Sequence, residues 1–221
     1  MREYLKKNKW LMIVTSVVIL LPILSGVLLW DKLPEKVPYH WGVNGEVDGW
    51  ASKPTAVFLL PLILLAVQWL CILVTGLEPK AKNVTTTKMM GLVLWIIPVL
   101  NLFLHIMVYL AAFGREVDMA TIMPLFIGVL FMVIGNYLPK CKQSYTMGIK
   151  LPWTLNDEEN WNATHRMAGR LWVAGGLLTM ICALLPGTSA FLVMMGILLT
   201  MCIVPTVYSY RFYKKKQENK E

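Results

Sequence analysis

The sequence predicts an all-α fold, a polytopic membrane protein with six transmembrane helices. Hydrophobic residues make up 57% of its 221 residues and charged residues only 15%, whereas an ordinary soluble domain is about 25% charged. The apolar residues come in long blocks, and blocks of about 18 or more with few charges are typical of bilayer-spanning helices. This composition excludes a soluble domain, low-complexity disorder and a disulfide-rich secreted scaffold.

Six apolar blocks are the predicted spans. They are Trp10–Trp30, Thr55–Leu77, Met89–Phe113, Ala120–Leu138, Leu171–Leu185 and Ala190–Tyr210. Trp10 and Trp30 bracket the first span, as expected of side chains that settle at bilayer interfaces. Basic residues before this span imitate a signal peptide, but its 21 residues exceed a typical signal-peptide core and no A-x-A cleavage site follows. We therefore expect a retained helix.

Basic residues are distributed unequally between the loops. If the N-terminus is cytoplasmic, the inside segments hold 17 of the 21 Lys and Arg residues and the outside segments hold 4. The positive-inside rule then predicts that both termini lie in the cytoplasm. The net charge of +8 is thus a signal of topology and of contact with membrane lipids, and we expect no direct binding of nucleic acid.

The predicted outer loop, DKLPEKVPYHWGVNGEVDGWASKP (31–54), has the pattern of a small hairpin. Apolar residues at 37, 39 and 41 alternate with Pro38 and His40, which is the period of a strand with one apolar face. Asn44-Gly45 follows, a strong signal for a type I′ turn. We expect an extracytoplasmic hairpin held against the outer leaflet or the helix ends by Tyr39, Trp41 and Trp50. Two roles stay open, an aromatic anchor and a recognition surface.

The long loop between the fourth and fifth spans predicts a turning segment and then a helix. Gly148 and Pro152 break regular structure, and Asn156 with Glu159 three residues later resembles a capping box. Tryptophans at 161 and 172, with His165 between them, would share one helix face. We expect an amphipathic helix in the membrane interface that turns into the fifth span. It would guide chain entry or offer a cytoplasmic docking surface for a protein partner.

Searches for catalytic motifs fail. The sequence has no G-x-x-x-x-G-K-[ST] phosphate loop, no H-E-x-x-H zinc helix and no G-x-S-x-G nucleophile elbow. The three histidines, His40, His105 and His165, fall at different predicted depths, so topology excludes a three-histidine metal site. We expect neither a cofactor nor a metal.

Four polar residues in or at the ends of the spans are candidate functional residues: Gln68, Asn101, His105 and Asn136. Polar groups in hydrocarbon must find partners, and an intramembrane ionisable residue is a functional candidate. The alternative is interhelical hydrogen bonding that fixes the packing, each bond contributing roughly 0.6–1.7 kcal/mol. No predicted span carries Asp, Glu, Lys or Arg, which argues against a proton- or ion-coupled pump.

The two long loops resemble known families. The outer stretch LPEKVPYHWGVNGEVDGWASKP is similar to a membrane domain of unknown function typified by L-P-x-x-[VI]-P-x-H-[WF] and then G-x-x-D-[GR]. The inner stretch contains YTMGIKLPWTL and then WNATHR, and it resembles the SdpI family of bacterial toxin-immunity membrane proteins. The resemblance divides the chain into an N-terminal two-span unit (1–88) and a four-span SdpI-like unit (89–221).

The resemblance implies a non-enzymatic immunity protein of the bacterial cytoplasmic membrane. Such proteins protect the producing cell from a secreted, membrane-active peptide toxin, and the signalling members also hold a DNA-binding autorepressor at the membrane. The toxin-side loop would contain Pro38, Tyr39, His40, Trp41, Gly45 and Trp50. The cytoplasmic motif would contain Tyr145, Thr146, Gly148, Pro152, Trp153, Thr154, Leu155, Trp161, Thr164, His165 and Arg166. Lys150 stands where the family commonly has Arg, and Lys cannot form a bidentate guanidinium contact.

Two other functions stay open beside immunity. A small transporter or exporter of hydrophobic peptide would use a path near Gln68, Asn101 and His105. A membrane enzyme acting on lipid or cell-wall precursors would use His40 or His165 as a general base. Neither histidine has an orienting carboxylate identifiable in the sequence, although Asp48 or Glu159 could approach in the fold.

Overall fold

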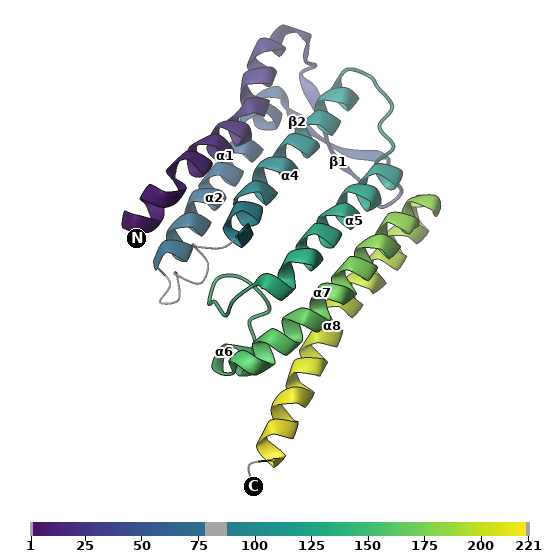
Figure 1. Ribbon diagram of the computed structural model, residues 1–221. Helices are drawn as coiled ribbons and strands as arrows, with labels where there is room; N and C mark the ends of the chain where they lie inside the picture. Colours follow the sequence, from purple (N-terminus) through teal and green to yellow (C-terminus); the bar gives the residue numbers. More distant parts are fainter. Residues whose placement is uncertain (1, 78–87, 220–221) are drawn as a thin grey trace. The chain divides into compact units, whose positions relative to one another are not determined.

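The structure is a computed structural model that describes residues 2–77 and 88–219. Within these residues the long helices are α1 (Arg2–Leu28), α2 (Leu60–Leu77), α4 (Lys88–Ala112), α5 (Met119–Tyr137), α7 (Glu158–Ile181) and α8 (Gly187–Glu218) (Figure 1). Six helical segments of the described chain are long and apolar enough to cross a membrane, one of them joining α2 to the π-helical turn Thr55–Leu59. The predicted all-α fold with six transmembrane helices is confirmed. The side of the membrane that the termini face stays a prediction.

Contacts divide the chain into two compact units. The first contains α1, the strands of a hairpin, α2 and α4, and the second contains α5, α7 and α8 together with the short helix α6 (Pro152–Asn156). The third span therefore packs with the first two. The division of the sequence at residue 88 follows the family resemblance, and it stays a prediction about sequence regions.

The predicted hairpin is present in the first unit. Strand β1 (Lys36–Trp41) pairs antiparallel with β2 (Val47–Ser52) (Figure 1). Val37 is fully buried in a cluster with residues of the neighbouring helix ends, and Tyr39 and Trp41 pack against the same cluster. Alternation along the strand therefore places one apolar face on the helices, as the sequence pattern predicts.

The turn of the hairpin differs from the expected type I′. Gly45 has a φ of +84°, whereas no described residue other than glycine has a positive φ, so Asn44 does not. A type I′ turn needs positive φ at both central residues. The Gly42 N–H instead donates to the Glu46 carbonyl at 2.8 Å, which encloses three residues. A three-residue loop needs only one left-handed position, and Gly45 occupies it.

The fifth span differs from the expected interfacial helix followed by a turn. Helix α7 runs without a break from Glu158 to Ile181. The Asp157 carboxylate caps its start by accepting hydrogen bonds from the backbone N–H groups of Glu159 and Asn160. The expected helix with Trp161 and His165 on one face is present, but it continues into the fifth span without a turn. Neighbouring segments bury Asn160, Thr164 and His165 in the first half of α7, whereas its charged residues stay exposed.

Glycines let α5 and α7 approach closely in the second unit. A methyl group on Gly176 would lie 2.6 Å from the Gly128 carbonyl oxygen, and one on Gly135 would lie 2.9 Å from that of Gly169. On each helix the two glycines are seven residues apart, which is about two turns. Small residues at such positions let backbones pack directly in a bilayer. This packing gives α7 a rigid neighbour beside its long loop.

Candidate functional site

The predicted toxin-side residues lie on two faces of the hairpin. Tyr39 and Trp41 are partly buried against the helix ends, and burial raises the pKa of the Tyr39 hydroxyl. Pro38 pairs with Trp50 across the strands, but Trp50 is 59% exposed. Contact with the helix ends thus comes from Tyr39 and Trp41, while Trp50 is free to contact a lipid or a ligand.

The exposed face of the hairpin also carries a histidine–carboxylate pair. His40 Nδ1 hydrogen-bonds to the Asp48 carboxylate across the two strands. Their side chains are 73% and 53% exposed. Asp48 therefore does approach His40, as the enzyme hypothesis allowed, but both groups lie in a solvent-accessible position. The pair gives this face a polar centre beside the aromatic ring of Trp50.

Lys53 fastens the base of the hairpin and was missed by the sequence reasoning. Its ammonium group lies 3.0 Å from the Glu35 carboxylate and 5.3 Å from the centre of the Trp30 ring. Lys53 is only 7% exposed, so its charge is compensated by both contacts. Trp30, at the predicted end of the first span, was the one signal in the sequence that could have suggested this cation–π contact.

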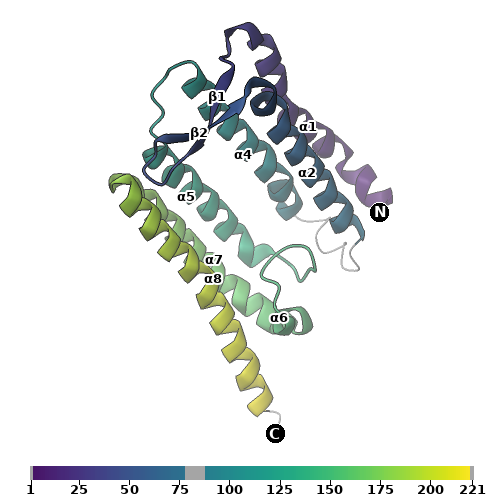
Figure 2. The same cartoon turned by 180° about the vertical axis from the view of Figure 1, so that it is seen from behind.

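The residues of the predicted cytoplasmic motif lie in a folded loop, which we call the motif loop (residues 141–157), and in the first turns of α7, on which this loop packs (Figure 2). His165 and Trp161 of α7 are buried and their rings stack with centres 4.1 Å apart. Gly148 has a φ of +98°, and a methyl group there would lie 2.5 Å from His165 Nε2 and 2.7 Å from a ring carbon of Trp161. Only glycine therefore lets the loop lie on these two rings.

Both nitrogens of His165 have partners. Nε2 accepts a hydrogen bond from the Ile149 backbone N–H at 2.9 Å, and Nδ1 lies 2.8 Å from the Trp161 carbonyl oxygen. The carbonyl can only accept, so Nδ1 carries the proton of a neutral ring. Trp161 Nε1 donates in turn to the Cys141 carbonyl at 2.7 Å. This arrangement anchors the loop and leaves no free lone pair on His165 for a general base.

Thr154 organises the P-W-T-L part of the motif loop. Its hydroxyl accepts from the Leu151 N–H and donates to the Ile149 carbonyl, each at 2.9 Å. The amide of Gln143 donates to the carbonyls of Thr154 and Leu155 at 2.8 Å. Residues 152–156 form the one-turn helix α6, where the sequence predicted an extended or turning segment. The threonine side chain replaces the backbone partners that such a short helix lacks.

The motif loop is also attached to α8. Trp153 packs against Tyr210 and Tyr213, with ring centres 5.4 and 6.2 Å apart. The Lys216 ammonium lies 2.7 Å from the Asp157 carboxylate and 2.9 Å from that of Glu159. Glu159 therefore pairs with Lys216. These contacts join the beginning of α7 to the last turns of α8.

The Asp157 carboxylate is stabilised in its charged form. Burial by itself raises its pKa, but hydrogen bonds from Lys216 and from two backbone N–H groups outweigh this, so the pKa lies below its ordinary value. The sequence reasoning missed Lys216 because it is 59 residues away along the chain. A lysine-rich last helix beside an acidic helix start was the available signal.

A buried hydrogen-bonded cluster of one amide and two hydroxyl side chains also joins α7 to α8. Asn160 Nδ2 donates to the Ser209 carbonyl at 3.0 Å, and its Oδ1 accepts from the hydroxyls of Ser209 and Thr164 at 2.8 and 3.0 Å. Thr164 is thus a packing residue. Asn160 and Ser209 were not predicted, although a serine within an apolar span is a detectable signal.

Several residues of the motif loop and of the first turns of α7 remain accessible. Tyr145 is 48% exposed, and Lys150, Pro152 and Arg166 are exposed as well. The Lys150 ammonium donates to the Thr146 carbonyl at 3.2 Å. The motif loop therefore has a buried half that fixes its shape and an exposed half that can meet a partner.

Three of the four predicted intramembrane polar residues are buried in the first unit, and the fourth is exposed at the end of α5. In the first unit, Gln68 donates to the Thr15 hydroxyl and Asn101 to the Ile19 carbonyl, both at 2.8 Å. Next to Asn101 on the same helix, His105 is also buried. Asn136, at the end of α5, is exposed. Gln68 and Asn101 thus link their helices to α1, which is the packing role that the sequence left open.

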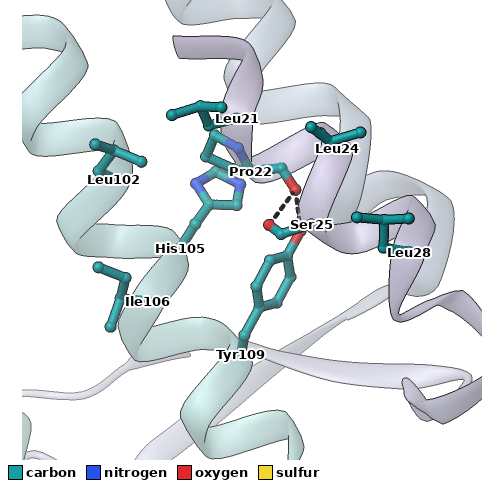
Figure 3. A pocket seen from close by; sticks show the side chains of 9 residues that line it. All are labelled: Leu21, Pro22, Leu24, Ser25, Leu28, Leu102, His105, Ile106 and Tyr109. Atoms are coloured by element: carbon teal, nitrogen blue, oxygen red, sulfur yellow. Dashed lines mark hydrogen bonds between the residues drawn. The ribbon is translucent and has the colours of Figure 1, made fainter. Parts of the chain in front are cut away.

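The described residues bring no group of three or more His, Cys, Asp or Glu side chains together as metal ligands would be. What the arrangement offers is a set of surfaces for binding: an exposed aromatic hairpin face, an exposed half of the motif loop, and an apolar groove beside His105 (Figure 3).

Two regions of the chain match known protein families. Residues 140–209 match the SdpI/YfhL protein family, and residues 17–65 match the domain of unknown function DUF1648. Over 211 residues the chain is 27% identical to the immunity protein SdpI of Bacillus subtilis (strain 168), covering 96% of this chain and 98% of that protein. No solved structure matches the chain. The resemblance seen in the two loops is therefore confirmed. The chain is a multi-pass bacterial membrane protein in which a stretch that matches DUF1648 precedes a stretch that matches the SdpI/YfhL family.

Proposed function

We propose that this protein is a non-enzymatic membrane immunity protein that protects its producer from a secreted, membrane-active peptide toxin. The observation that carries the proposal is the similarity to an immunity protein along 96% of the chain and 98% of that relative. Similarity of this extent includes both long loops and all six spans. The termini would be cytoplasmic, with the hairpin outside and the motif loop inside, in agreement with the positive-inside rule.

Immunity needs binding and no chemical step. An exposed aromatic surface at the membrane boundary suits an amphipathic peptide, because aromatic side chains are stable at that depth. On the hairpin, Trp50 and the His40–Asp48 pair offer such a surface. Binding there would favour whichever arrangement of the helices binds the peptide more tightly.

The finer part of the proposal is signalling through an autorepressor held at the membrane. The exposed half of the motif loop, with Tyr145 and Lys150, and the exposed Arg166 of α7 would contact the repressor on the cytoplasmic side. The buried half, with Gly148, would only hold this surface in shape. A basic and aromatic surface of this kind suits an acidic patch on a protein partner.

Survival of a toxin-sensitive bacterium tests the immunity function. Cells that express the chain should survive a secreted peptide toxin from a Bacillus producer better than cells with an empty vector. Trp50→Ala should reduce this protection because it removes an exposed ring of the hairpin face. Trp10→Ala removes a ring that is 77% exposed elsewhere and should keep protection. Absence of any protection by the unaltered chain would refute the immunity function.

Localisation of a fluorescent repressor tests the signalling part separately. The regulator would be the DNA-binding protein produced with the toxin system of the same Bacillus producer. Toxin should bring it to the membrane in cells with the unaltered chain. Tyr145→Ala and Arg166→Ala should leave it in the cytoplasm while protection is retained. Arg170→Ala, an exposed arginine outside the motif, is the control. A regulator that stays cytoplasmic with the unaltered chain would remove the signalling part alone.

A further inference from the structure

Helices α5 and α7 of the second unit run antiparallel and touch along their glycines (Figure 1). Gly135 of α5 packs against Gly169 of α7, whereas the other glycine contact joins an earlier residue of α5 to a later residue of α7. Asn136 directly follows the first of these glycines, and Arg170 directly follows the second. The two residues therefore lie at about the same level along the helix pair, near the end that is joined to the motif loop.

Asn136 and Arg170 also lie on one side of the contact between the two helices. Each is one residue, or about 100°, beyond a contact glycine, and in an antiparallel pair equal turns lead to the same side. The opposite turn leads to Phe131 and Trp172, whose ring centres are 5.6 Å apart. Helix α8 packs on that other side, because Trp172 Nε1 donates to the Met201 carbonyl at 3.2 Å. The side with Asn136 and Arg170 is therefore not covered by α8.

The side chains of Asn136 and Arg170 have no partner in the described part of the chain. Both are exposed, and neither side chain forms a hydrogen bond or an ion pair with another described residue. Arg166, one turn nearer the motif loop on the same side of α7, is also exposed and, among the described residues, unpaired. Two guanidinium groups and one amide thus carry hydrogen-bond donors that the protein itself does not use.

The depth of these groups restricts what can bind them. The membrane span that contains α5, Met119–Lys140, has 22 residues, or about 33 Å at 1.5 Å per residue, close to the hydrocarbon thickness of about 30 Å. Asn136 lies about 6 Å before the end of this span. A long arginine side chain at the same level reaches the boundary of the hydrocarbon, where lipid phosphate and ester oxygens are the available acceptors. An unpaired charge at this depth needs such a partner.

We infer that Asn136 and Arg170 form a binding site for the headgroup of an anionic phospholipid. The planar guanidinium of Arg170 donates two parallel hydrogen bonds to the phosphate, and the Asn136 amide donates to a phosphate or ester oxygen. Arg166 adds positive charge beside them, which disfavours headgroups that carry a cation of their own. The inference goes beyond the proposed function and does not depend on it, because Arg170 lies outside the surface proposed for the repressor.

Thermal melting of the full chain in a neutral detergent tests the site, because a ligand that binds only the folded state raises the melting temperature. Phosphatidylglycerol should raise it, whereas phosphatidylcholine at the same concentration should raise it much less and inorganic phosphate should not. Arg170→Gln should weaken the binding of phosphatidylglycerol about tenfold, or about 1.4 kcal/mol, and Asn136→Ala about threefold. Without lipid, Arg170→Gln should melt with the unaltered chain, because its side chain has no described partner to lose.

Arg211→Gln is the matched control. Arg211 is an exposed arginine of α8, the helix on the other side of α7, and it too is unpaired among the described residues. The substitution removes the same charge and should leave the affinity for phosphatidylglycerol unchanged. Equal losses in Arg170→Gln and Arg211→Gln would mean a diffuse attraction of lipid to positive charge and would overturn the site. Equal stabilisation of the unaltered chain by phosphatidylcholine, or by inorganic phosphate alone, would overturn the assignment to an anionic lipid.

Discussion

Replacing Gly148 with alanine should open the motif loop. The backbone at Gly148 has a φ of +98°, and an L-residue in a left-handed conformation costs about 1–2 kcal/mol. The new methyl group would also lie 2.5 Å from His165 Nε2 and 2.7 Å from the Trp161 ring. Since both rings are buried and stacked, the loop must move away from them.

Movement of the loop breaks the hydrogen bond from the Ile149 N–H to His165 Nε2. Leaving these buried groups unpaired costs about 1–3 kcal/mol. Together with the backbone strain, we expect the free energy of opening the loop to fall by about 2–5 kcal/mol. A tenfold change corresponds to about 1.4 kcal/mol. The population of the open loop should therefore rise about 30-fold or more.

Cys141 reports on this opening. Its side chain is 5% exposed, and its carbonyl accepts from Trp161 Nε1. In a variant whose other three cysteines are replaced by alanine, the rate of labelling by a water-soluble maleimide measures how often the loop opens. Gly148→Ala should raise this rate about 30-fold or more.

Gly114→Ala is the matched control. Gly114 also has a positive φ, +74°, but a methyl group there would meet nothing within 4 Å. It should cost only the backbone strain and leave Cys141 labelling unchanged, because Gly114 lies in the other compact unit. If Cys141 in Gly148→Ala reacts at the rate of the unaltered chain, contact between the loop and the two rings is not what holds the motif loop.

Further predictions concern charge, helix packing and an interhelical hydrogen bond. Because the folded pKa of Asp157 is lowered, its pairing stabilises the protein above the ordinary carboxyl pKa and is lost as the pH falls through the folded pKa. The melting temperature in detergent should therefore fall from about pH 5 to about pH 3, and less so in Lys216→Met. Gly176→Val should push α7 away from α5 and lower the free energy of unfolding by about 1–3 kcal/mol, whereas Gly196→Val, with nothing within 4 Å, should not. Denaturation in mixed micelles measures both variants, and equal losses would contradict this expectation. Asn101→Leu should cost about 0.6–1.7 kcal/mol in the same assay, and an unchanged stability would show that its bond to Ile19 contributes nothing.

Patterns within one segment predicted much of the fold. A span needs a continuous apolar block because the bilayer core offers no partner for backbone polar groups, so six blocks predicted six helices. Alternation at positions 37, 39 and 41 predicted one buried strand face. The sequence predicted a type I′ turn at Asn44-Gly45 and a turn between the amphipathic helix and the fifth span, and both predictions were wrong. Both depend on small differences between local conformations, which neighbouring segments decide.

The candidate site was less predictable, because its partners are distant in sequence. His165 was singled out, but nothing local indicates that its Nε2 accepts from Ile149, or that Gly148 must lack a side chain because two rings lie beneath it. Lys216 was counted only as a basic residue of the last segment, although it pairs with Asp157.

The amino-acid sequence by itself determined that the chain crosses a membrane, where it does so, and which two loops carry the family motifs. These properties follow from apolar length, period and residue identity, and each is contained in a short stretch of chain. Only the tertiary structure decided which polar groups are satisfied. Gln68 finds Thr15 across 53 residues, whereas His105 Nε2 finds no partner. The physical reason is that a buried polar group is stable only with a partner placed by packing, and packing brings together residues that no local pattern connects.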